Sequence, residues 1–94
     1  MPPPQFHLQN DAATDAVSML SLDQQDGHTG RVRWHGVVTR DTDEQHLQAG
    51  RREYFQIDRS WIAENRGREV LINYSLYRGN NERFRFSRVL RLRL

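Results

Sequence analysis

The segment Glu69–Leu94 reads EVLINYSLYRGNNERFRFSRVLRLRL, and its pattern decides the fold class. Apolar and polar residues alternate on both sides of a Gly/Asn-rich stretch, which is typical of a β-hairpin. The inward positions are predicted to be Val70, Ile72, Tyr74 and Leu76 on the first arm, and Phe84, Phe86, Leu90, Leu92 and Leu94 on the second. Arg88 interrupts the second series, which predicts a β-bulge near Ser87 or a change of edge there.

Length and composition limit what the chain can be. A chain of 94 residues is expected to form one domain with a modest core. The lack of cysteine excludes disulfides and cysteine-based metal or redox chemistry. No apolar run reaches the ~18 residues that span a bilayer, so no membrane insertion is expected. Three prolines predict a flexible extended arm over residues 1–4, which leaves residues 5–94 as the single domain.

Charge is unevenly distributed along the chain. All 14 basic residues are arginine. Residues 1–50 hold three of them beside seven acids, a net charge of −4, whereas residues 51–94 hold eleven beside five acids, a net charge of +6. Such a split can mark an anion-binding face or contact between copies whose opposite ends attract, but a solvated strand face also produces it and is the preferred interpretation.

Upstream segments predict further strands of the same sandwich. Arg31–His35 alternates and places Trp34 inward, and Phe55–Ile57 has the same period. A brief edge strand is expected at Phe6–Leu8. Residues 16–22 fit either a helical stripe or a kinked strand, and the turn-rich residues that follow favour the strand.

One short helical turn is predicted near residues 59–65. Asp58 stands at the N-cap position, and Gly67 stands where a helix commonly ends in a left-handed glycine. Trp61 gives this turn a large apolar surface, so we expect the turn to close one end of the sandwich.

The order and spacing of these motifs resemble the immunoglobulin-like repeats of large bacterial surface and secreted proteins. The motifs are Val32-x-Trp34-x-Gly36, Phe55-x-Ile57, Asn65-x-Gly67, Val70-x-Ile72-x-Tyr74-x-Leu76-x-Arg78 and Leu90-x-Leu92-x-Leu94. The resemblance covers roughly residues 17–94 and implies an immunoglobulin-like β-sandwich of about seven antiparallel strands. It also implies a spacer or adhesion role without catalysis, and a secreted or cell-surface location, although no signal peptide is visible.

The sequence predicts no catalytic residues, no cofactor and no metal site. It has no G-x-S-x-G elbow, no phosphate-binding glycine loop and no evident nucleophile–base pair. The four histidines are scattered without the spacing of a zinc pair. Asp41-Thr42-Asp43-Glu44 offers oxygens of the kind that calcium prefers, but it lacks the glycine and distal glutamate of an EF-hand loop. A solvated acidic loop is the better interpretation.

The candidate binding residues are arginines of one parity in the final segment: Arg83, Arg85, Arg91 and Arg93. If the strand is regular they project from one face, where bidentate hydrogen bonds could hold an acidic glycan or nucleic acid. Phe84 and Phe86 are expected to point inward, so the aromatics that single-strand binding needs are missing from that face. Alternating arginines also keep an edge strand soluble.

The sequence therefore supports two main hypotheses about function. The leading one is a non-catalytic interaction module that contacts neighbouring domains, another protein or a second copy of itself. The alternative is a ligand-binding domain for acidic glycan or nucleic acid through the arginine-lined strand. A small enzyme would need a concave pocket with convergent titratable groups.

Overall fold

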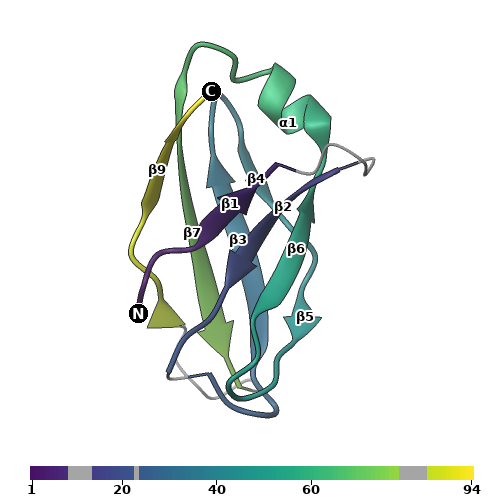
Figure 1. The fold of residues 1–94 in the computed structure, drawn as a ribbon, viewed down its shortest axis with the longest axis vertical. Helices are drawn as coiled ribbons and strands as arrows, with labels where there is room; N and C mark the ends of the chain where they lie inside the picture. Colours follow the sequence, from purple (N-terminus) through teal and green to yellow (C-terminus); the bar gives the residue numbers. More distant parts are fainter. Residues whose placement is uncertain (9–13, 23, 79–84) are drawn as a thin grey trace.

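The computed structural model describes residues 1–8, 14–22, 24–78 and 85–94 (Figure 1). Within these ranges the chain forms nine strands and one short helix. The strands make two antiparallel sheets, which pack face to face. The predicted all-β sandwich is therefore confirmed.

The smaller sheet has the strand order β1-β2-β6. Its strands are β1 (Gln5–His7), β2 (Asp15–Met19) and β6 (Glu53–Ile57). Every residue of the central strand β2 is buried. The segment that fitted both a helix and a strand is thus a strand, because neighbours on both sides and the facing sheet cover it.

The larger sheet has the order β4-β3-β7-β8. Its strands are β3 (Thr29–His35), β4 (Thr39–Asp41), β5 (Gln45–His46), β7 (Glu69–Tyr77), β8 (Arg85–Phe86) and β9 (Leu90–Arg93). β5 continues the edge begun by β4 along β3, and β9 continues the edge begun by β8 along β7. The nine strands therefore fill seven positions, in agreement with the predicted number.

The core lies between the two sheets and follows the period-two alternation of their strands. Its members are Val17, Met19, Val32, Trp34, Leu47, Phe55, Ile57, Val70, Ile72, Tyr74 and Leu76. Trp34 is the largest of the fully buried side chains. The inward positions predicted for β3, β6 and β7 are confirmed.

The last segment of the chain crosses β7 with one extra residue. Phe86 pairs with Ser75 and Leu90 pairs with Ile72, so three steps along β7 are matched by four along the last segment. One residue between β8 and β9 is therefore unmatched, which defines a β-bulge. The bulge predicted near Ser87 is confirmed.

Ser87 holds the bulge in place. Its side chain is buried, and its hydroxyl accepts a hydrogen bond from the Tyr74 backbone N–H at 2.9 Å. The Ser87 backbone N–H in turn donates to the Tyr74 carbonyl oxygen at 2.9 Å. A serine hydroxyl thus supplies an acceptor to β7 at the point where the regular ladder is interrupted.

The bulge exchanges the two faces of the strand. Phe86 pairs with Ser75, a residue that points away from the core, and cross-strand partners share a face. Phe86 is 64% exposed, so the prediction that it points inward is wrong. Leu90 and Leu92, beyond the bulge, pair with core residues and pack against the core as predicted. Phe84 lies outside the described residues.

The predicted helical turn is confirmed as α1 (Arg59–Ala63). The Asp58 carboxylate caps it by accepting a hydrogen bond from the Ser60 backbone N–H at 2.9 Å, and Gly67 has a φ of +73°. The Trp61 ring packs against the Trp34 ring with centroids 6.1 Å apart. The helix therefore covers one end of the sandwich, as expected (Figure 1).

The proline-rich residues 1–4 lie against the sandwich. Pro4 is buried, and Met1 is partly buried against the core. The Met1 carbonyl oxygen also accepts a hydrogen bond from the Arg88 backbone N–H at 3.2 Å. Met1 and Pro4 are therefore packed and Pro2 and Pro3 are exposed, whereas the prolines alone predicted a flexible arm.

Candidate functional site: a groove on the larger sheet

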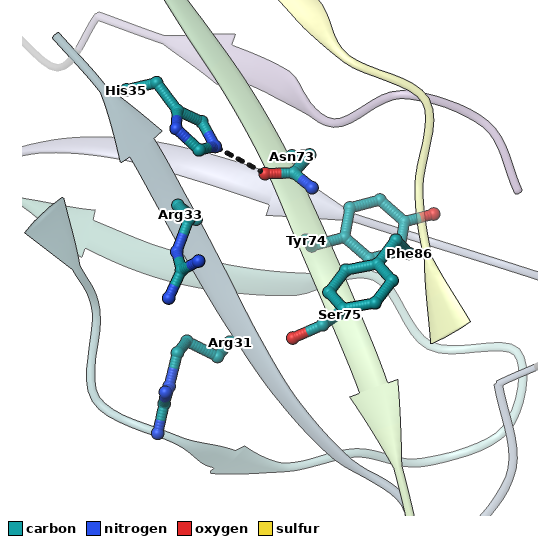
Figure 2. Close-up of a pocket in the computed structure, with 7 residues that line it drawn as sticks. All are labelled: Arg31, Arg33, His35, Asn73, Tyr74, Ser75 and Phe86. Carbon is teal, nitrogen blue, oxygen red and sulfur yellow. Dashed lines mark hydrogen bonds between the residues drawn. The ribbon is translucent and has the colours of Figure 1, made fainter. Parts of the chain in front are cut away.

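A shallow groove of about 310 Å³ opens on the side of the larger sheet that faces away from the core (Figure 2). It is lined by Arg31, Arg33, His35, Asn73, Tyr74, Ser75 and Phe86, which come from β3, β7 and β8. We refer to the outward side chains of this sheet as the outer face; they include Arg31, Arg33, His35, Asn73, Ser75, Phe86, Arg91 and Arg93. Side chains alternate along β3 and β7, so those that do not point into the core lie on this outer face.

The register of β3 and β7 shapes the groove. Arg31 pairs with Ser75 and Arg33 pairs with Asn73, so each arginine starts beside a shorter polar side chain. Phe86 lies on the far side of Ser75 and forms the opposite wall. The result is a polar floor between an aromatic ring and two arginine stems.

One end of the groove is closed by a polar contact. His35 Nε2 and Asn73 Oδ1 form a hydrogen bond at 3.3 Å, which Figure 2 shows across the two central strands. Both side chains are half-buried. The groove therefore presents an imidazole, an amide and a hydroxyl along its length.

The two arginines of β3 already hold carboxylates. Arg33 makes a bidentate pair with Asp41 of β4, with N–O distances of 2.7 and 2.9 Å. Arg31 Nη2 lies 2.6 Å from Glu44 Oε1. These pairs draw the guanidinium groups toward the β4–β5 edge, away from the Phe86 ring (Figure 2). A polyanion would have to displace both carboxylates.

The Arg33–Asp41 ion pair also shifts the pKa of both of its partners. The hydrogen bond to Asp41 raises the pKa of the Arg33 guanidinium, and the ion-pair attraction adds to this. The hydrogen bond from Arg33 lowers the pKa of the Asp41 carboxyl, although burial works in the opposite direction. Both groups therefore stay charged at neutral pH and hold the β3–β4 edge together.

The predicted arginine row does not form as one row. Arg91 and Arg93 lie on the outer face of β9, with Arg91 Nη1 at 3.1 Å from Glu69 Oε1. Arg85 pairs with the inward-facing Leu76 and so takes the opposite face of the strand. The extra residue of the bulge separates these arginines, which share a parity in the sequence. Arg83 lies outside the described residues.

The groove was not predicted from the sequence, although the sequence contains part of the signal. The alternation of Arg31–His35 predicted that the arginines and the histidine of β3 point outward. The break at Arg88 predicted the bulge, and an extra residue there is enough to turn Phe86 outward. What could not be derived was the pairing of β3 with β7, which brings Arg33 and Asn73 side by side.

The structure also brings together a serine and a histidine. His7 Nε2 lies 2.7 Å from Ser18 Oγ, and Arg52 Nη1 donates to the same oxygen at 3.1 Å. Ser18 is fully buried beneath these groups, so a substrate has no access to its hydroxyl. We interpret this contact as a link between β1, β2 and the start of β6.

The acidic segment Asp41–Glu44 is spread over the β4–β5 edge. Asp41 and Glu44 are paired with arginines, and the described residues hold no group of three or more side chains suited to a metal ion.

In the part of the chain that the structure describes, no helix is long and apolar enough to cross a bilayer.

Comparison with family models, with curated proteins and with solved structures found no match to this chain. Function is therefore inferred from the side chains that the fold presents.

Proposed function

We propose that this chain is a non-catalytic interaction module that contacts a partner protein through the outer face. The observation that carries the proposal is the outward position of Phe86. Its ring is 64% exposed and forms one wall of the groove, opposite the stems of Arg31 and Arg33. Aromatic residues and arginine are enriched at the centres of protein interfaces, where they provide most of the binding energy.

The charges of this face favour a protein over a polyanion. Its four arginines are Arg31, Arg33, Arg91 and Arg93, and three of them are paired with carboxylates. The surface therefore presents both signs of charge in fixed positions. Such a pattern selects a complementary protein surface and gives a uniform row of phosphates little net attraction.

An immunoglobulin-like architecture is part of the same proposal. Two antiparallel sheets of three and four positions, with a tryptophan buried on the third strand of the chain, support it. The motifs around Trp34 and Asn65 support it as well, since both occupy structural positions in the sandwich. A secreted or cell-surface location in a bacterium follows from this resemblance.

Site-specific photo-crosslinking tests the proposed surface. The photoreactive residue p-benzoylphenylalanine replaces Phe86 in one variant and Tyr54 in the control. Tyr54 is also an exposed aromatic, at 48%, but it lies on the smaller sheet. We expect a discrete crosslinked protein from position 86 and none from position 54. Equal adducts at both positions, or none at position 86, would reject the outer face as the contact surface.

The alternative, binding of an acidic glycan or nucleic acid, gains one observation. Phe86 lies on the same face as Arg91 and Arg93, so an aromatic ring for stacking is present where the sequence predicted none. Binding to heparin and to a single-stranded oligonucleotide at low salt measures this function, with Phe86→Ala as the variant and Tyr54→Ala as its control. Lack of measurable binding at low salt would exclude it.

A further inference from the structure

One end of the sandwich carries two exposed valines close to a group of arginines. The β3–β4 turn presents Val37 and Val38, which are 48% and 49% exposed. Helix α1, the turn at residues 64–68 and the C-terminal residue lie at the same end (Figure 1). We refer to these parts together, with residues 36–38, as the α1 end.

The valine turn is held rigidly. Asn65 is fully buried, and its Oδ1 accepts a hydrogen bond from the Val37 backbone N–H at 2.8 Å. Its Nδ2 donates to the Trp61 carbonyl oxygen at 2.7 Å, which ties the turn to α1. The Gly36 N–H donates to the Val38 carbonyl oxygen at 3.3 Å. The valines are therefore presented to solvent on a backbone that has little freedom left to lose on binding.

The hydrogen bonds of Asn65 also fix the position of the next residues in the chain, which include two arginines. Arg66 and Arg68 flank Gly67, are exposed, and have no carboxylate partner among the described residues. Hydrogen bonds from Gly67 N–H to the Leu94 carbonyl oxygen and from Leu94 N–H to the Arg68 carbonyl oxygen, at 3.0 and 2.9 Å, bring the last strand here as well.

Two carboxylate side chains at this end have other partners. Asp58 caps α1 through Ser60, and Glu64 makes a bidentate pair with Arg40 at 2.7 and 2.9 Å. Among the described residues, neither of these carboxylates forms an ion pair with Arg66 or Arg68. The α1 end combines an apolar tip with a positive rim.

We propose that the α1 end docks on the headgroup layer of an anionic lipid bilayer. Val37 and Val38 reach the boundary between headgroups and acyl chains, and Arg66 and Arg68 contact the anionic headgroups. A nucleic acid attracts the arginines but offers no apolar layer for the valines. A tip two residues wide is also small beside the roughly 800 Å² per partner of a stable protein interface. This contact needs no membrane-spanning segment.

Vesicle cosedimentation tests the proposal on the whole chain. Binding is expected to phosphatidylcholine vesicles that contain phosphatidylserine, to weaken as salt rises, and to be absent from pure phosphatidylcholine. Val37→Asp and Val38→Asp are each expected to weaken binding at least about tenfold, because a carboxylate replaces the apolar contact and is repelled by the headgroups. The double substitution Arg66→Glu and Arg68→Glu is also expected to weaken vesicle binding at least about tenfold.

Two matched controls lie elsewhere on the surface. Val89→Asp changes a valine that is 46% exposed beside β9, and Arg51→Glu changes an exposed arginine at the start of β6. Both are expected to leave vesicle binding within about twofold of the unmodified chain, which is the small effect of a distant surface charge. Equal losses in the controls and in the α1-end variants would overturn the proposal.

A second measurement avoids any doubt about folding of the aspartate variants. The chain has no cysteine, so Val38→Cys and Val89→Cys each give a single site for an environment-sensitive dye. A blue shift with phosphatidylserine vesicles is expected at position 38 and not at position 89. The proposal is wrong if the chain binds neither kind of vesicle, or if it binds pure phosphatidylcholine vesicles equally well. It is also wrong if the Arg66 and Arg68 substitutions weaken vesicle binding while the dye at position 38 shows no blue shift. The last outcome indicates a polyanion contact.

Discussion

Asn65 lies directly across Gly36, and its side chain occupies the space that a Cβ atom at position 36 would need. The amide is fully buried and holds both the β3–β4 turn and α1 through hydrogen bonds. It cannot move aside without losing them. The glycine at the end of β3 is thus required by a residue far away in the sequence.

Gly36→Ala is expected to destabilise the fold by about 1–3 kcal/mol, the usual cost of overpacking a buried contact. Denaturant unfolding measures the loss. In the Asn65→Ala background the added methyl group has room, so most of the cost of Gly36→Ala should disappear. Additive effects of the two substitutions would show that the two residues do not compete for space.

Trp34→Ala is expected to cost about 3–5 kcal/mol, as the loss of a core aromatic does. The ring is fully buried and packs against Phe6 and Trp61. Trp34→Phe should cost much less, because a phenyl ring still fills most of the space and because the buried Trp34 Nε1 has no hydrogen-bond acceptor among the described residues. A loss below about 1 kcal/mol for Trp34→Ala would contradict its position in the core.

Phe86→Ala tests the exchange of faces at the bulge. Because the ring is largely exposed, the free energy of unfolding should change by no more than about 0.5 kcal/mol. Phe55→Ala is the matched substitution in the core and is expected to cost about 3–5 kcal/mol. Similar losses for the two phenylalanines would mean that Phe86 is buried after all.

The Arg33–Asp41 pair predicts part of the acid sensitivity of the protein. Because folding lowers the pKa of Asp41, its contribution to stability is present above the unfolded value of about 3.9 and is lost as pH falls through the folded value. The pair is partly exposed, so the contribution is about 0.2–1 kcal/mol.

Asp41→Asn should therefore reduce the dependence of unfolding free energy on pH in the acid range. Asp43→Asn removes a neighbouring charge that has no ion pair among the described residues, so it serves as the control. Urea titrations at a series of acidic pH values make the comparison. An identical pH dependence in the Asp41→Asn variant and the unmodified chain would exclude this role for the pair.

The local patterns of the sequence predicted much of the fold. Alternation in Arg31–His35 and in Glu69–Tyr77 was enough to assign the inward and outward sides of β3 and β7. The capping residues Asp58 and Gly67 were enough to place α1. These features depend on neighbours in the chain, so they can be derived without knowing which strands pair.

The candidate site could be predicted only in part, because it depends on pairing and register. Parity predicted that Arg85 and Arg91 share a face, and one extra residue at the bulge reversed this. The pairing of Arg33 with Asp41 and the contact of Asn65 with Gly36 join separate segments, which only the folded structure shows.

The proposed contact through the outer face is tested most directly with the partner that is crosslinked at position 86. Its dissociation constant is measured by calorimetry for the unmodified chain, for Phe86→Ala and for Tyr54→Ala. If Phe86 anchors the interface, its substitution should weaken binding about thirtyfold, as expected for a loss of about 2 kcal/mol at an interface hot spot, and Tyr54→Ala should bind like the unmodified chain. Equal affinities of Phe86→Ala and the unmodified chain would contradict the outer face as the binding surface.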